Sequence, residues 1–219
     1  MDIQTVSTEA KAMVIFLVKN GLAEDQNMPV TTRIGTRTEV TFDTAAAITI
    51  SLKDMDYQST YDQLNEARAF SAKLLDGALL QILYRFRRRG IESHRLAYFP
   101  SPYVAEFQTD PETYIGEPIF AEVTARRIVP VPIRFDYDTN AQAREAHPAS
   151  HLSLGQYENC RIPVTSPVSP RQFVAFILDS FYNSAFELCR STFPNHQDLF
   201  PECISAEDTK KVHVCPGVA

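Results

Sequence analysis

The sequence predicts a single α+β domain in which a small, mostly antiparallel sheet packs against two or three helices. Helical spacing of apolar residues is confined to a few segments, and several short segments alternate apolar and polar residues as half-buried strands do. No repeat or shift of composition marks a linker within residues 1–219. With 44% hydrophobic and 22% charged residues, a chain of this length can bury its own core.

The N-terminal segment predicts a helix over residues 5–20, because apolar residues recur at helical intervals from Val6 to Leu17. Ser7 or Thr8 is expected to cap its start, and Asn20 precedes a glycine that is a suitable stop. Further along, residues 47–52 alternate apolar and hydroxyl side chains, which predicts a half-buried strand.

Residues 57–89 predict one long helix or a broken pair of helices, since apolar residues keep a helical period from Leu64 to Phe86. Gly77 interrupts this pattern. A glycine inside a helix costs about 1 kcal/mol relative to alanine, so a kink is expected there. Gly90 is expected to end the helix, and a strand is expected over residues 95–99.

Three more strands are predicted over residues 129–138, 150–154 and 160–164, each with alternating side chains. Ser169-Pro170 then predicts the start of a helix, with serine as N-cap and proline in the first turn. Its Phe173 and neighbouring phenylalanines form a stripe that we expect in the core. Residues beyond 190 show no clear period.

If the three strands between residues 129 and 164 pair as a meander, their polar residues share one face. That face would carry Arg134, Asp136, Asp138, His151, Ser153 and Arg161, with His147 at its rim. One interpretation is the solvated side of a sheet, with cross-strand charge pairs worth about 0.2–1 kcal/mol each.

The other interpretation of this face is a functional site. Asp136, Asp138 and His151 would handle protons, and Arg134 and Arg161 would bind phosphate, with His147 and Ser153 also in binding roles. The face has no Lys or Glu, which are the usual solubilising residues of an exposed sheet. Both interpretations therefore stay open.

A divalent metal is a candidate cofactor of unknown identity. The two aspartates and His151 offer ligands to Mg²⁺ or Mn²⁺. His147 is four residues from His151, but Pro148 disfavours the helix that would make them a metal-binding pair. The tail offers Cys189, His196, Cys203, His213 and Cys215 without the spacing of a zinc site, and we expect all four cysteines of the chain to be reduced thiols.

The arginines are unevenly placed in a chain whose net charge is −6. Arg outnumbers Lys 15 to 6, and one run contains Arg85, Arg87, Arg88, Arg89 and Arg95. The run is expected either to be a helix end whose cations complement the helix dipole or to be a patch that binds phosphate or a partner. The net charge gives no global attraction to nucleic acid or anionic lipid.

Several functional classes are disfavoured by what the sequence lacks. No apolar run reaches the roughly 20 residues that cross a bilayer, and no signal peptide is evident, so a cytoplasmic protein without a membrane partner is expected. The glycine motifs of nucleotide-binding loops, dinucleotide-binding folds and α/β-hydrolases are missing.

Five blocks in combination resemble a bacterial family of unknown function. They are Asp76-Gly77-Ala78 with Gln81 and Tyr84, then residues 94–102, 134–138, 147–155 and 160–163. The resemblance covers about residues 55–188. It implies bacterial origin and a place in mobile or phage-defence loci, without an established activity. A fainter resemblance is to small toxins of toxin–antitoxin pairs, which carry an Arg-x-Asp strand before a His-rich segment, although this chain lacks their dense histidine cluster.

The expected function is that of a bacterial antiviral-defence or toxin-type protein that binds or acts on RNA, DNA or a nucleotide through the Arg/Asp/His face. If it is an enzyme, a nuclease or another phosphodiester-directed activity is expected. The alternative is a non-catalytic accessory subunit that recognises a partner protein encoded in the same locus. Its contact surface would be residues 85–95 and the aromatic strip 98–103.

Overall fold

A computed structural model describes residues 1–42, 55–88, 90–103, 131–140, 147–157, 159–195 and 198–217. The helices are α1 (Ile3–Lys19), α2 (Tyr57–Glu66), α5 (Pro170–Phe181) and α6 (Asn183–Cys189), with short 3₁₀ turns η5 (Arg190–Thr192) and η6 (Asp208–Lys210). The strands are β1 (Ala23–Gln26), β2 (Val30–Ile34), β3 (Arg37–Thr41), β4 (Ala72–Leu74), β5 (Leu79–Arg87), β6 (Gly90–Phe99), β7 (Ile133–Asp138), β8 (Ser150–Leu154) and β9 (Ile162–Pro163).

These nine strands form one sheet whose main path runs β1-β4-β5-β6-β7-β8-β9. Strand β3 pairs with the C-terminal half of β5, beside β4, and β2 pairs with β3 at the edge. Every pairing between these strands is antiparallel. The predicted α+β class with a mostly antiparallel sheet is therefore confirmed, although the sheet is larger than expected.

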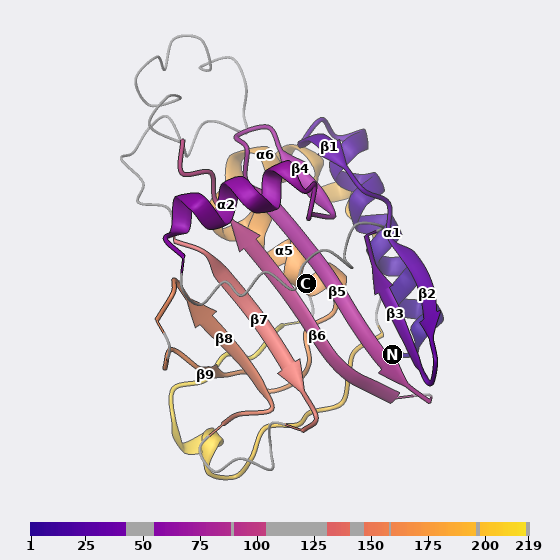
Figure 1. Cartoon of the computed structure of the whole chain (residues 1–219), viewed down its shortest axis with the longest axis vertical. Helices are drawn as coiled ribbons and strands as arrows, with labels where there is room; N and C mark the ends of the chain where they lie inside the picture. Colours follow the sequence, from indigo (N-terminus) through magenta and orange to yellow (C-terminus); the bar gives the residue numbers. More distant parts are fainter. Residues whose placement is uncertain are drawn as a thin grey trace.

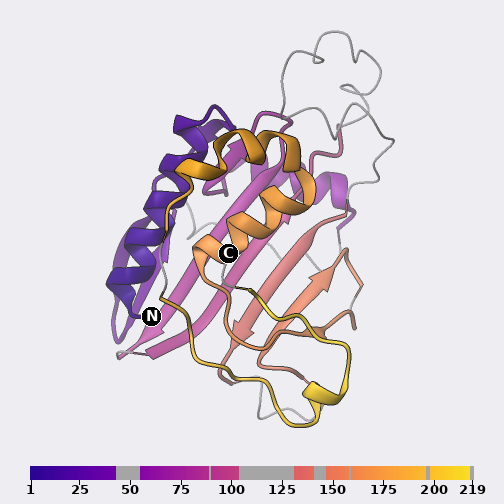
Figure 2. The ribbon, with the colours of Figure 1, turned by 180° about the vertical axis from the view of Figure 1, so that it is seen from behind.

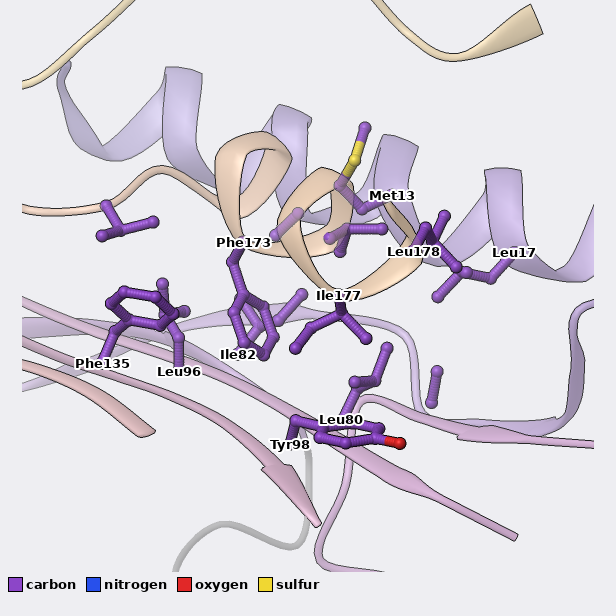
Figure 3. Close-up of a cluster of buried hydrophobic side chains, with 14 of the residues drawn as sticks. Met13, Leu17, Leu80, Ile82, Leu96, Tyr98, Phe135, Phe173, Ile177 and Leu178 are labelled. Atoms are coloured by element: carbon purple, nitrogen blue, oxygen red, sulfur yellow. The ribbon is translucent and has the colours of Figure 1, made fainter. Parts of the chain in front are cut away.

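Helices cover the two faces of the sheet unequally. Helices α1, α5 and α6 lie on one face, which Figure 2 shows in front, whereas α2 crosses the other face at the upper ends of β5 and β6 in Figure 1. The main core forms under α5, where Phe173 and Ile177 pack over sheet residues such as Ile82 and Leu96 (Figure 3). This confirms the predicted core stripe. Under α2, Tyr61 and Leu64 belong to a smaller cluster.

Both predicted terminal helices are present, but only one cap is as expected. Helix α1 begins earlier than predicted, because Asp2 caps it by accepting a hydrogen bond from the Thr5 N–H at 2.8 Å. The expectation of Ser7 or Thr8 as the cap is wrong. In α5, Ser169 is the cap as predicted, and its hydroxyl and the Gln172 side chain form a reciprocal capping box.

The long helix predicted over residues 57–89 is wrong beyond Glu66. The chain instead forms β4 and β5, and Gly77 takes a φ of +84° in the turn between them rather than kinking a helix. Gly90 begins β6 instead of ending a helix. From Leu79 to Tyr84, strand β5 is largely buried on both faces because α5 covers one face and α2 the other, whereas Arg85 and Arg87 are exposed. A strand buried on two faces loses its alternation and imitates a helical pattern.

The three strands predicted between residues 129 and 164 are confirmed as neighbouring antiparallel strands β7, β8 and β9, although β9 is only two residues long. The strand predicted over residues 47–52 lies outside the described residues. All four cysteines are free thiols, as expected.

Buried hydrogen bonds join the sheet to the C-terminal third of the chain. The Tyr84 hydroxyl donates to the Val168 carbonyl at 2.7 Å, and the Tyr182 hydroxyl donates to Oδ2 of Asp76 at 2.7 Å. The Tyr182 hydroxyl also lies 3.0 Å from that of Tyr98. Burial raises the pKa of the Asp76 carboxyl. The hydrogen bond from Tyr182 satisfies this carboxyl, whose burial without a partner would destabilise the fold.

Candidate functional site

The register of the sheet brings the predicted polar residues onto one face. Asp136 of β7 lies opposite Arg95 of β6 on one side and opposite His151 of β8 on the other. Arg134 lies opposite Ser153. Residues directly opposite each other in a sheet share a face. The predicted common face of Arg134, Asp136, His151 and Ser153 is therefore confirmed, on the side away from α5.

Asp136 sits between two arginines. Its Oδ1 accepts a hydrogen bond from Nε of Arg95 at 3.0 Å, and its Oδ2 accepts one from Nε of Arg134 at 2.5 Å. Burial alone would raise the pKa of this carboxyl, but the two guanidinium groups hold the pKa below its ordinary value of 3.8. Asp136 is therefore ionised at neutral pH, and both oxygens are engaged, an arrangement better suited to orienting arginines than to moving protons.

The two arginines keep their terminal nitrogens for other partners. Among the described residues, none accepts a hydrogen bond from Nη1 or Nη2 of Arg95 or Arg134, whose side chains are 47% and 36% exposed. Arg68 shows the contrasting arrangement, because both of its Nη atoms contact Asp25. We call Arg95 and Arg134, with Asp136 between them, the two-arginine clamp. The free fork of a guanidinium is the part that binds phosphate or carboxylate in a bidentate manner.

His151 is a buried imidazole beside this clamp. It is only 7% exposed, and burial lowers its pKa to about 4 against the opposing effect of Asp136. Its Nδ1 lies 3.3 Å from the Pro148 carbonyl, and Nδ1 of His147 lies 3.1 Å from the same oxygen. Because a carbonyl only accepts, the neutral ring of His151 carries its proton on Nδ1. The Nε2 of His151 is left with a lone pair that can accept a proton.

Two predicted site residues lie apart from the clamp. Asp138 is exposed at the end of β7, where its Oδ1 accepts hydrogen bonds from the backbone and side chain of Asn140. Arg161 is exposed just before β9, and it forms no ion pair with any residue that the structure describes. The structure thus gathers Arg134, Asp136 and His151 but leaves Asp138 and Arg161 outside the clamp.

The arginine run lies on strands, so the helix-end interpretation is wrong. Arg85 and Arg87 project from β5, and Arg88 follows with a φ of 59° at the turn into β6. Nε of Arg85 lies 2.9 Å from Oε1 of Glu39 on β3. Arg89 lies outside the described residues. Arg85 and Arg87 occupy the same face as the clamp, as their alternate positions in β5 and the pairing of Arg85 with Ser93 require.

Sequence reasoning missed the acidic partners of these arginines. Glu39 pairs with Arg85, and Glu92 pairs with Arg37 at 2.8 Å and with Arg87 at 3.9 Å. The alternation of polar and apolar residues over 39–42 was the available signal for β3 and its side-chain directions. No sequence signal gave its pairing with β5, which joins residues far apart in the chain.

The aromatic strip predicted as a partner surface is largely buried. Tyr98 and Phe99 are each 5% exposed and belong to the two cores. Tyr103 is partly exposed, and its hydroxyl donates to Asp62. This strip therefore does not form the contact surface expected for an accessory subunit.

Two further observations concern metal binding and membrane insertion. Among the residues that the structure describes, no three His, Cys, Asp or Glu side chains gather as they would around a metal ion. Within the same residues, none of the helices combines the length and the apolar character needed to span a bilayer.

The fold and the site define an α+β protein whose sheet carries an arginine-rich face on one side and its main core on the other. The chain belongs to the DUF2290 family of uncharacterised conserved proteins, whose family model matches residues 22–215. This confirms the resemblance to a family of unknown function and extends it on both sides of residues 55–188. No curated protein and no solved structure shows a significant match to the chain.

Proposed function

We propose that the protein binds a phosphate-bearing ligand, such as RNA, DNA or a nucleotide, on the two-arginine clamp. The observation that carries this proposal is the sharing of one partly buried carboxylate by two arginines through their Nε atoms. Asp136 thereby holds two guanidinium forks in fixed positions before a ligand arrives. Such pre-organisation reduces the ordering cost of binding, and charge-assisted bidentate contacts favour phosphate.

His151 is the residue of this face that supports chemistry beyond binding. Its pKa of about 4 keeps the imidazole neutral at pH 7, with Nε2 able to accept a proton. A neutral histidine beside bound phosphate is an arrangement that phosphodiester-directed enzymes can use for proton transfer. A role in bacterial defence or as a toxin, in the cytoplasm, rests on the resemblance stated above and not on the clamp.

The test is equilibrium binding of fluorescent nucleic acids and nucleotides to the whole chain at low salt. Changing both Arg95 and Arg134 to Gln should weaken binding at least tenfold, because each lost charge-assisted contact is worth about 1.5–3 kcal/mol. Arg190→Gln is the matched control, since Arg190 is a similarly exposed arginine paired with Asp179 and Glu187 at the end of α6.

Equal binding by the clamp variant and the control variant, at equal thermal stability, would overturn the proposal. Single-turnover incubation of His151→Ala with the bound ligand separates binding from chemistry. If ligand binding persists and turnover disappears, His151 has a catalytic role. If binding and turnover both persist, the chemistry does not depend on His151; if the unchanged chain shows no turnover, the protein is a binding module.

A further inference from the structure

We propose that the ligand is the phosphodiester backbone of a nucleic-acid duplex, which lies diagonally over the sheet along a stripe of five arginines. This inference rests on the proposed function and deepens it by naming the ligand class. The arginine stripe consists of Arg37 on β3, Arg85 and Arg87 on β5, Arg95 on β6 and Arg134 on β7.

The strand register places these arginines in order across the sheet. Arg37 lies opposite Arg87, and Arg85 lies opposite Ser93, two residues before Arg95 on β6. Arg134 in turn lies opposite Ala97, two residues after Arg95. Each step from β5 to β6 and from β6 to β7 is therefore a diagonal neighbour on one face. Such neighbours are about 7–8 Å apart, so their side chains form a continuous row.

The length of the stripe indicates a polymeric ligand. From β3 to β7 there are three strand spacings of about 4.8 Å, and from the level of Arg87 to that of Arg134 there are about six residues at roughly 3.4 Å each. The stripe therefore spans roughly 25 Å. A mononucleotide would occupy the clamp alone and leave Arg37, Arg85 and Arg87 without a phosphate.

The charges along the stripe also suit a backbone. On this face, β3, β5, β6 and β7 carry the five arginines and four acidic residues, Glu39, Glu92, Asp136 and Asp138, so these strands have a net charge of +1 there, although the chain as a whole has a net charge of −6. Arg85 contacts Glu39 through Nε, as the clamp arginines contact Asp136, and no described residue accepts from its Nη atoms. The same contact, from Nε of an arginine to a carboxylate, thus recurs on three neighbouring strands.

The side chains between the arginines favour a duplex over a single strand. Proteins that bind single strands stack the bases on exposed aromatic side chains. Within the described part of β3, β5, β6, β7 and β8, the stripe's face presents no exposed Phe or Tyr; its aromatic residue Phe99 is buried under α2. A duplex keeps its bases stacked internally and offers phosphates alone, which is what the stripe can contact.

The test compares four probes with the whole chain: a 20-base-pair DNA duplex, the matching RNA duplex, the single strand of the same sequence, and ATP. We expect either duplex to bind more tightly than the single strand and ATP. Duplex affinity should rise with length up to about eight base pairs, since the backbone advances about 3.4 Å per nucleotide. Preference between the two duplexes identifies the nucleic acid within the same class.

Variants of Arg85 and Arg87, the β5 arginines of the stripe, provide the mutational test; we call these two the distal arginines. Changing Arg85 and Arg87 to Gln leaves the Arg37–Glu92 pair and the clamp intact, so the fold should survive, as a thermal melt would verify. The slope of log affinity against log salt should then fall by nearly two, because each phosphate contact contributes about 0.9. Lys210→Gln, which removes an exposed lysine paired with Glu207, is the control and should leave the slope unchanged.

Different outcomes separate this inference from the proposed function. If ATP binds the clamp as tightly as any duplex and the distal change has no effect, the inference falls and the proposed function stands. Tighter binding of the single strand would likewise overturn the inference alone. If no probe responds to the clamp arginines, both fall together.

Discussion

His94 and His151 lie on opposite faces of the sheet, yet burial lowers the pKa of both imidazoles to about 4. His94 lies in the main-core layer between Tyr84 and Tyr137, and its Nε2 accepts a hydrogen bond from the Val168 N–H at 3.0 Å. Its tautomer is thereby fixed as Nδ1–H. Both histidines are uncharged in the folded protein down to about pH 4, whereas in the unfolded chain they titrate near pH 6.5.

The first prediction concerns the pH dependence of folding. The two histidines give stability that is fully present above pH 6.5 and is lost as the pH falls toward 4. Glu9 acts in the opposite sense, because burial raises its pKa to about 7 and its stability is lost as the pH rises from 4.5 to 7. Between pH 5 and 6, each histidine takes up close to one proton on unfolding and lowers the free energy of unfolding by about 1.4 kcal/mol per pH unit of acidification, whereas Glu9 offsets about one such contribution. The Asp76 carboxyl, whose pKa burial also raises, acts in the same sense as Glu9.

Glu9→Gln tests this balance, because the side chain is 1% exposed and its Oε2 has no hydrogen-bond partner among the described residues. Between pH 5 and 6, urea unfolding should show that the stability of the variant falls on acidification by about 1.4 kcal/mol per pH unit more than that of the wild type. At pH 8 the variant should be more stable by about 1–3 kcal/mol, since it no longer buries a charge. Parallel pH profiles for the two proteins would contradict the assignment.

The second prediction concerns the buried Asp76–Tyr182 hydrogen bond. Tyr182→Phe removes the hydroxyl that donates to a carboxyl only 2% exposed. The free energy of unfolding should fall by about 1–3 kcal/mol, because a buried acceptor loses its partner. Tyr157→Phe, at a side chain 77% exposed, should change stability by less than about 0.5 kcal/mol. Similar values for the two variants would argue against an energetic role for this contact.

The third prediction concerns the turn between β4 and β5. Gly77 has a φ of +84°, and a Cβ there would lie 3.2 Å from Ser101 and from the Tyr61 hydroxyl. Gly77→Ala should cost the left-handed strain of about 1–2 kcal/mol and an additional clash. Gly35→Ala, with a φ of +62° and open space around it, should cost only the strain. Denaturant unfolding of both variants isolates the clash as the difference, and no difference would refute it.

The fourth prediction concerns the cysteines. All four should react with a thiol reagent in urea, because none of them forms a disulfide. In the native state Cys215 should react first because it is exposed, whereas burial raises the pKa of Cys203 to about 11 and slows its reaction. The check is a stopped-flow titration at pH 8. Cys215→Ser should remove the fast phase, and a fast phase that persists would show that another thiol is accessible.

Whether a segment was predicted correctly depended on how many of its faces are buried. Strand β8 was predicted at its observed bounds, because one face meets the core and its alternation is visible in the sequence. Strand β5 was mistaken for helix because both faces of its first part, Leu79 to Tyr84, are covered. The common face of Arg134, Asp136 and His151 followed from alternation alone, whereas the contribution of Arg95 required the register between β6 and β7. Register between distant segments is set by tertiary packing, which no local pattern records.

The long-range hydrogen bonds of Tyr84 and Tyr182 have a consequence for synthesis on the ribosome. Tyr84 is synthesised 84 positions before its partner Val168, and Asp76 is synthesised 106 positions before its partner Tyr182. Until α5 emerges, the nascent chain displays the apolar side of β5 and β6 that this helix later covers. The nascent chain should therefore not reach its compact fold before α5 has been synthesised. Until then, we expect chaperones to bind the exposed apolar surface of the sheet.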